Sequence, residues 1–345
     1  MLGWLAGEES RFLEASFGSS PDSLGQSLAK ILPDLGAVLT APLVEALRAQ
    51  ECKRVCLIPC GNLSLLPLHA APYGGGRCLL DEFDVSYAPS AQAFAGASLK
   101  RQEAESSAPS LVAIGDPDGT LPFAGPEAKV IGGLISPGRS RVLVGSDATR
   151  SAWLAALPGA THIHLACHGK FDPGEPLDAS LMLARGERLT LRDLLDDPSL
   201  RSQRTRLAVL SACQTAITEF WNVPNEALGL PSGFLLAGIP GIVGSLWKVS
   251  DASTALLMVR LYEGLFQEGL APQAALRQAQ LWLRNATRDD LNSFCERYPG
   301  LAGLAGCWRV RELDEVPETE RPNHAEDNLP FSLPYFWAGF VYTGC

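Results

Sequence analysis

The chain has 345 residues, of which 46% are hydrophobic and 19% charged, enough to bury the core of one large α/β domain or two ordinary ones. Its net charge of −10 and sequence pI of about 5.1 argue against non-specific nucleic-acid binding, which needs a surface rich in Lys and Arg. The nine cysteines are an odd number and include no C-x-x-C pair, unlike the even count of a small disulfide framework.

The amino-terminal sequence favours a cytoplasmic protein with reduced thiols. MLGWLAGEESRF lacks a basic segment and carries Glu8 and Glu9 early, so it does not resemble a signal peptide. No run of eighteen apolar residues occurs, and we therefore expect no membrane span.

Residues 1–50 show a helical pattern. Apolar side chains recur at helical spacing between Leu28 and Leu39, and residues 41–47 continue with helix-forming residues. Pro33 predicts a break, because proline lacks the amide hydrogen that a helix interior uses.

Beyond residue 50, short apolar runs closed by Gly, Pro, Asp or Ser predict buried strands, with helical patterns between many of them. The predicted strands are 55–58, 85–87, 111–114, 141–144, 163–166, 181–184, 207–210, 242–246 and 336–342. The predicted helices are 151–157, 253–266 and 272–283. This alternation predicts a mostly parallel sheet covered on both faces. Residues 101–109, which are polar, and 309–330, which are acidic, are predicted loops or linkers.

One predicted strand ends in a histidine, in the sequence THIHLACHG (161–169). Ligands of open α/β sheets bind beyond the carboxyl ends of the strands, so His168 is a candidate functional residue. Gly169 allows close approach to the backbone. His162 and His164 lie inside the strand and are interpreted as core residues.

A second predicted strand ends in a cysteine, in RLAVLSACQT (206–215). Cys213 follows His168 by 45 residues, close to the spacing of about 50 found in caspases. A neighbouring imidazole activates a thiol for attack, and the backbone N–H groups of Gly169 and Cys213 are candidates for an oxyanion hole. Alone, Cys213 would be interpreted as a small buried residue. Cys167, adjacent to His168, should point to the opposite face of the strand and is assigned to the core.

A glycine-rich stretch, GIPGIVGSLWKVSD (238–251), contains the strand predicted over 242–246, and Asp251 follows that strand. Asp251 is interpreted either as the cap of the helix that follows or as a carboxylate that binds a basic side chain. No nucleophile elbow, Walker A loop or H-E-x-x-H motif occurs, and the five histidines show no convincing zinc pattern with cysteine.

Several segments resemble, in order, the CHAT domain, a caspase-like peptidase domain often attached to TPR arrays. They are IPCGNLSLLPLHAAP (58–72), YAPS (87–90), AIGDP (113–117), LPFAGPEAKVI (121–131), HLACHG (164–169), LSACQT (210–215), NEALGLPSGFLLAGIPGIVGSLWKVSD (225–251) and PYFWAGFVYTG (334–344). The resemblance covers most of residues 40–344. Residues 1–40 and an insertion at about 285–330 lie outside it.

The resemblance implies a three-layer α/β/α sandwich and membership of the clan CD His–Cys endopeptidases, with caspases, separases and gingipains. It carries His168 and Cys213 onto the catalytic pair. SLWKVSD is similar to a separase segment whose Asp helps to recognise a basic P1 residue, which makes Asp251 an S1-pocket candidate. The family usually has Asp where this chain has Asn225. The resemblance also implies regulated cleavage of protein partners, including in bacterial defence and cell death.

We therefore divide the chain into a helical segment, 1–40, and a CHAT caspase-like protease domain, 41–345. The first segment is hypothesised to be the tail of a TPR or similar sensor array that regulates the protease. The predicted function is a cysteine endopeptidase that cleaves a protein or peptide and needs no metal or organic cofactor.

Two alternatives remain open: a catalytically inactive CHAT-fold interaction module, and a nucleotide-binding or hydrolase α/β domain. The second is disfavoured because no phosphate-cradling glycine loop precedes a helix.

Overall fold

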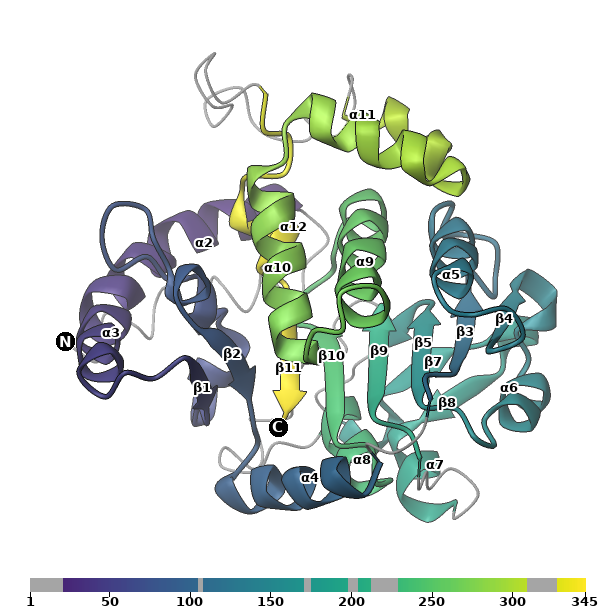
Figure 1. The fold of residues 1–345 in the computed structure, drawn as a ribbon. Helices are drawn as coiled ribbons and strands as arrows, with labels where there is room; N and C mark the ends of the chain where they lie inside the picture. Colours follow the sequence, from purple (N-terminus) through teal and green to yellow (C-terminus); the bar gives the residue numbers. More distant parts are fainter. Residues whose placement is uncertain (1–20, 105–107, 171–174, 198–203, 212–228, 309–327) are drawn as a thin grey trace.

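The computed structural model describes residues 21–104, 108–170, 175–197, 204–211, 229–308 and 328–345. These residues form an eight-stranded sheet in the order β1-β2-β11-β10-β9-β5-β3-β4, with helices on both faces (Figure 1). The strands are β1 (Arg54–Leu57), β2 (Asp84–Tyr87), β3 (Leu111–Gly115), β4 (Ser140–Val144), β5 (His162–Ala166), β9 (Leu207–Ser211), β10 (Gly241–Ser245) and β11 (Phe340–Gly344). The predicted three-layer α/β/α architecture is confirmed.

The sheet changes direction once among these strands. Strands β10, β9, β5, β3 and β4 are parallel, and β1, β2 and β11 are parallel to one another. The two groups meet at the antiparallel pair β10–β11. The carboxyl ends of the five-strand group therefore share one edge of the sheet, where a ligand site is expected.

Both faces of the sheet are buried, which explains why its strands read as continuous apolar runs. Along β9, Leu207 and Val209 belong to one core cluster, whereas Ala208 and Leu210 belong to the other. This alternation follows from the two-residue period of a strand. The site edge thus rests on a scaffold that is packed from two sides.

One face is covered by α5 (Ala124–Gly133), α9 (Asp251–Phe266) and α10 (Pro272–Asn285). The opposite face carries α4 (Ala91–Ala104), α6 (Arg150–Ala156), α7 (Leu191–Asp196) and α8 (Leu230–Leu236) (Figure 1). The predicted helices 151–157, 253–266 and 272–283 correspond to α6, α9 and α10. The prediction of a loop over 101–109 is wrong for its first residues, because α4 continues to Ala104.

A small antiparallel sheet follows β5 directly. It consists of β6 (Gly169–Lys170), β7 (Ser180–Met182) and β8 (Arg188–Thr190). Its β7 strand corresponds to the prediction for 181–184, although Ala184 begins a 3₁₀ turn. This sheet fixes the chain immediately after His168, because Met182 N donates to the carbonyl of His168 at 2.8 Å.

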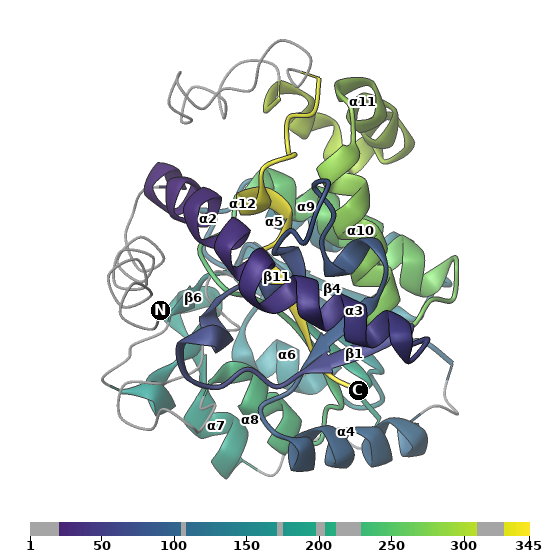
Figure 2. The same cartoon turned by 90° about the vertical axis from the view of Figure 1, so that its left-hand side faces the viewer.

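The amino-terminal helices form one continuous stretch on the side of the molecule that carries β1 (Figure 2). Helix α2 (Pro21–Leu35) passes through Pro33, continues as a π-helical turn over Gly36–Thr40 and enters α3 (Ala41–Ala49). The break predicted at Pro33 is therefore wrong, and the disturbance appears as the π turn. Gly36 is required there, because a Cβ would lie 1.6 Å from the carbonyl oxygen of Pro72.

Residues Leu24–Ala49 are long and apolar enough to cross a membrane, judged by length and composition alone. The same stretch packs on the domain, since Leu24, Leu28, Ile31, Leu32 and Leu35 are buried in the main core cluster. A core helix of a globular domain passes the same test, and these contacts match that description.

The carboxyl-terminal segment supports the loop that leads to Asp251. The strand predicted over 336–342 is in fact a short helix, α12 (Pro334–Trp337), followed by β11. Trp247 is buried and its indole N–H donates to the carbonyl of Tyr335 at 3.1 Å. Gly339 makes this fit possible, because a Cβ would lie 3.0 Å from the indole of Trp247.

The described part of the predicted 285–330 insertion forms α11 (Arg288–Arg297) and a 3₁₀ segment over Pro299–Gly306. Figure 1 shows α11 beyond α9 and α10, on the side away from the sheet. Arg297 pairs with the buried Glu263 of α9 at 3.0 Å. This part of the insertion therefore adds an outer layer to one helical face.

Candidate active site

The carboxyl ends of β5 and β9 lie side by side. Their parallel register pairs Ala166 with Ser211, so His168 and Cys213 each follow a paired position by two residues. His168 is about two-fifths exposed, with 39% of its side chain accessible. Cys213 lies outside the described residues, as does Asn225. The structure thus places His168 at the predicted edge, and the pairing with Cys213 remains a prediction.

A hydroxyl and a carboxylate face one ring nitrogen of His168. The Nε2 atom lies 2.7 Å from Oγ1 of Thr120 and 4.0 Å from Oδ2 of Asp118. Thr120 in turn donates its hydroxyl hydrogen to Oδ1 of Asp118 at 2.8 Å. Among the described residues these contacts are made by Nε2, so Nδ1 is the nitrogen that can face a reacting group.

Both residues belong to the loop between β3 and α5, which is tied to the sheet by Asp116. The backbone N–H of Asp116 donates to the carbonyl of Ala166 at 2.9 Å, and its side chain accepts from Leu121 N at 2.9 Å. Asp116 adopts a positive φ of 48°, a conformation that Asp tolerates better than most residues. The loop is therefore anchored beside the last residue of β5.

The same loop reaches Asp251 at its other end. Asp251 is the first residue of α9, and Ser250 is the cap, with its side chain accepting from Ser253 N. The interpretation of Asp251 as the helix cap is wrong, because the helix begins two residues earlier than expected. Its Oδ2 instead accepts a hydrogen bond from Phe123 N at 2.9 Å.

The environment of Asp251 favours the protonated carboxyl. Burial raises its pKa to about 6, the charges of Glu127 and Asp116 act in the same direction, and the hydrogen bond from Phe123 N opposes them. A cationic ligand would relieve this repulsion. The arrangement suits a site that accepts a guanidinium or ammonium group.

The residues assigned to the core are buried as predicted. His162 forms a hydrogen bond through Nδ1 to Oγ1 of Thr161 at 2.8 Å. Cys167 lies in the core cluster on the sheet face covered by α6, α7 and α8. Nε2 of His164 is 2.9 Å from Oε1 of Glu127, with both side chains almost fully buried. This contact is close enough for an ion pair but is not aligned as a hydrogen bond.

Gly169 opens β6 and pairs with Leu181. Its assignment to an oxyanion hole, together with the Cys213 N–H, remains a prediction. Among the described residues, no group of three His, Cys, Asp or Glu side chains is arranged to hold a metal ion.

Sequence reasoning did not single out Asp116, Asp118, Thr120 and Glu127. The available signal was the position of DPDGT (116–120) directly after a buried strand, at the edge where loops carry function. The hydrogen-bonding partners could not be read from this run, because the loop folds over a strand some fifty residues away.

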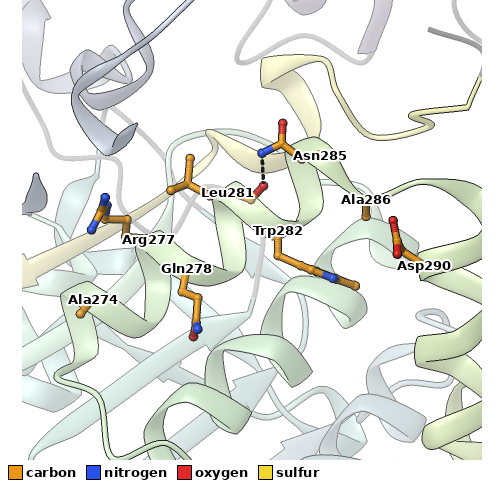
Figure 3. Close-up of a pocket in the computed structure, with 8 residues that line it drawn as sticks. All are labelled: Ala274, Arg277, Gln278, Leu281, Trp282, Asn285, Ala286 and Asp290. Atoms are coloured by element: carbon orange, nitrogen blue, oxygen red, sulfur yellow. Dashed lines mark hydrogen bonds between the residues drawn. The ribbon is translucent and has the colours of Figure 1, made fainter. Parts of the chain in front are cut away.

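Three cavities elsewhere on the molecule contain none of the predicted site residues. Figure 3 shows one of them, a groove of about 490 Å³ along α10. It is lined by Ala274, Arg277, Gln278, Leu281, Trp282, Asn285, Ala286 and Asp290. The candidate site is therefore defined by the loop and strand ends rather than by these cavities.

Comparison with known proteins agrees with the fold. The CHAT domain family model matches residues 30–345, whereas no curated protein sequence matches significantly. Separase in the Saccharomyces cerevisiae separase–securin complex is similar over 85% of this chain, with 15% identity and a TM-score of 0.51. RgpB of Porphyromonas gingivalis, in a complex of its pro- and mature domains, is similar over 91%, with 12% identity and a TM-score of 0.50.

Both neighbours are caspase-like clan CD cysteine peptidases, and this chain has the same fold. It spans 16% of the separase chain and 71% of the RgpB chain.

Proposed function

Because the chain belongs to the CHAT domain family, we propose that it is a cysteine endopeptidase in which Cys213 is the nucleophile and His168 the general base and acid. The observation that carries this proposal is the register of β5 with β9. It pairs Ala166 with Ser211, and adjacent parallel strands carry the residues that follow them to the same edge of the sheet.

In the proposed reaction, the Cys213 thiol gives its proton to His168 Nδ1 and its sulfur attacks the scissile carbonyl carbon. The backbone N–H groups of Gly169 and Cys213 stabilise the resulting oxyanion. The imidazolium then protonates the leaving amine as the C–N bond breaks. Water, deprotonated by the same nitrogen, hydrolyses the thioester and regenerates the thiol.

Asp251 is proposed to recognise a basic P1 side chain. It lies at the same edge as His168 and contacts the same loop, through Phe123 N. Its carboxylate is partly buried beside Glu127 and Asp116, which disfavours its charge in the empty site. A substrate guanidinium supplies the missing counter-charge, so binding and charge compensation occur together.

The substrate is proposed to be a protein, with activity controlled by a partner or sensor region. Separase, whose fold this chain shares, was crystallised as a complex with securin. The chain also spans about a sixth of separase. Its helical amino-terminal residues are therefore proposed to connect to regulatory elements, which fits cleavage in defence or cell-death systems.

The test is covalent labelling of the purified protein with a peptide acyloxymethyl ketone that carries Arg at P1, followed by intact and tryptic mass spectrometry. One adduct on Cys213 is expected, because only an activated thiolate displaces the acyloxy group rapidly. Labelling should disappear in Cys213→Ala and fall strongly in His168→Ala. Cys60→Ala is the matched control, since Cys60 is an exposed free cysteine with no proposed role.

Two results would contradict the proposal. Equal labelling of Cys60 and Cys213 would show that Cys213 is not activated. Labelling of Cys213 that persists unchanged in His168→Ala would exclude the dyad. The first result would favour the inactive interaction module, whereas the second would assign the activation of Cys213 to a group other than His168.

A further inference from the structure

The contacts of His168 determine which of its ring nitrogens carries a hydrogen. Thr120 Oγ1 lies 2.7 Å from His168 Nε2 and 2.8 Å from Asp118 Oδ1. A hydroxyl has a single hydrogen, and a carboxylate can only accept. The hydrogen of Thr120 is therefore donated to Asp118, and the contact with His168 requires Nε2 to be the donor.

We propose that Thr120 and Asp118 are positioning residues that hold the neutral His168 ring with its hydrogen on Nε2. Nδ1 is then the bare nitrogen that accepts the thiol proton. This inference rests on the proposed function for its catalytic consequence, but the tautomer itself does not. When Nδ1 takes the proton, the Nε2–H···Oγ1 bond persists, and the carboxylate of Asp118, 4.0 Å from Nε2, compensates the new positive charge through Thr120.

The loop does not need the Thr120 side chain for its shape. Asp116 holds it through Ala166 and Leu121, and Phe123 holds it through Asp251. Thr120 N also lies 3.4 Å from Asp118 Oδ1, so the backbone contact survives when the hydroxyl is removed. A substitution at Thr120 therefore tests the ring contact more than the fold.

Solvent access sets the expected size of the effect. The side chains of His168 and Asp118 are 39% and 42% exposed, so water replaces part of a lost contact. Thr120→Val should lower kcat by roughly ten- to thirtyfold, since orientation of a general base accounts for only part of its contribution. KM for a peptide should change by less than about twofold, because the ring is not a binding group.

Thr120→Ser is the matched control, because it keeps the hydroxyl and removes one methyl group. It should restore kcat to within about threefold of the unsubstituted protein. A Thr120→Val protein with unchanged kcat would overturn the catalytic part of the proposal. So would a Thr120→Ser protein as impaired as Thr120→Val.

The second readout needs no turnover. Two-bond ¹H–¹⁵N correlation spectra of ¹⁵N-histidine-labelled Cys213→Ala protein, recorded near pH 8.5 where an imidazole is ordinarily neutral, report the tautomer of each ring. The His168 signal is identified by its loss in His168→Gln. We expect the Nε2–H pattern, and a mixture of tautomers after adding Thr120→Val.

An Nδ1–H pattern for His168 in the Cys213→Ala protein would overturn the proposal whatever the activity measurements give. Conversely, an Nε2–H pattern in a protein that cleaves no peptide would uphold the positioning contact and count against the proposed peptidase. The failures of the two proposals are therefore distinguishable.

Discussion

The loop between β3 and α5 has two ends with different surroundings. At one end, Asp118 and Thr120 meet His168 in a partly exposed position. At the other end, Phe123 N donates a hydrogen bond to Asp251, whose carboxyl is partly buried. Burial, and to a lesser degree the charge of the fully buried Glu127, raises the pKa of this carboxyl. The two ends are only a few residues apart in sequence.

The difference shows how solvent exposure gives two aspartate side chains, Asp118 and Asp251, different properties. An exposed carboxylate keeps most of its hydration, so Asp118 acts through the direction of its hydrogen bonds. The partly buried carboxyl of Asp251 loses part of its hydration, and this loss, with a smaller contribution from the charges of Glu127 and Asp116, raises its pKa to about 6. The same short loop therefore orients the proposed base, His168, through Thr120 and places the charge of Asp116 near the proposed specificity residue, Asp251.

The largest expected effect is on stability at the buried end. Glu127 lies 2.9 Å from His164, and both are almost fully buried. Glu127→Ala leaves a buried imidazole without its partner and should cost about 3 kcal/mol of unfolding free energy, measured by urea denaturation at pH 7.

Glu127→Gln is the matched control, because it keeps a polar group of the same size. It should cost about 1 kcal/mol. Equal stability of Glu127→Ala and the unsubstituted protein would mean that the buried pair contributes nothing to the free energy of unfolding. Burial would then affect the energetics of the two ends of the loop less than we infer.

The next effect concerns substrate choice. Asp251→Asn should lower kcat/KM for peptides with Arg at P1 by roughly a hundredfold, the size of a charge-assisted contact in a partly buried site. Peptides with an apolar P1 residue should lose less than about threefold. The measurement is the ratio of the two kcat/KM values.

Asp147→Asn controls for the change in net charge, because Asp147 is exposed after β4. It should leave the ratio unaltered. Equal losses for basic and apolar peptides in Asp251→Asn would remove the pocket assignment while leaving the proposed dyad untouched.

A smaller effect should appear with pH. The carboxyl of Asp251 has a pKa of about 6, so it is mostly ionised at pH 7.5 and mostly protonated at pH 5. The Arg-to-apolar ratio of kcat/KM should therefore fall about tenfold over this range. Taking the ratio cancels any titration of the dyad that both substrates share.

The ratio should not change with pH in Asp251→Asn. In Glu127→Gln the fall should move to lower pH, because the charge of Glu127 raises the pKa of Asp251. A ratio that is constant in the unsubstituted protein would contradict the assignment of a basic P1 contact.

Much of the fold could be predicted from local patterns. Strands β3, β5, β9 and β10 were predicted to within one or two residues, because buried parallel strands are short apolar runs closed by turn residues. The last strand was misplaced because FWAGF mixes a helical turn and a strand in one apolar segment. The small β6 and β8 strands were missed because two or three residues show no periodicity.

The site was predictable only where it follows a strand directly. The positions of His168 and Asp251 at one edge could be predicted because the carboxyl ends of β5 and β10 lie there, and their roles stay predictions. Thr120 and Asp118 could not be predicted, because their role depends on the path of a loop that crosses to a neighbouring strand. The raised pKa of Asp251 also depends on Glu127, which lies on the much earlier helix α5, and neither spacing nor composition encodes that approach.

The smallest expected effect is on the free energy of unfolding, and it tests the charge of Asp251. Because the pKa of Asp251 is raised to about 6 from 3.8, the folded state binds more protons than the unfolded state between these values. Stability from this group is therefore present at low pH and is lost as the pH rises through about 6. Asp251→Asn removes the charge, while its side-chain oxygen can still accept from Phe123 N.

The substitution should therefore stabilise the protein at pH 8 by on the order of 1 kcal/mol, after allowance for solvent screening and for a lost favourable charge in the first turn of α9. The gain should shrink as the pH falls toward 4, which urea unfolding at several pH values would measure. Asp118→Asn, at the exposed end of the loop, should change stability by less than about 0.5 kcal/mol throughout. A loss of stability in Asp251→Asn at pH 8 would mean that the ionised carboxylate is compensated in the empty site, and the proposed need for a basic substrate group to neutralise it would fall.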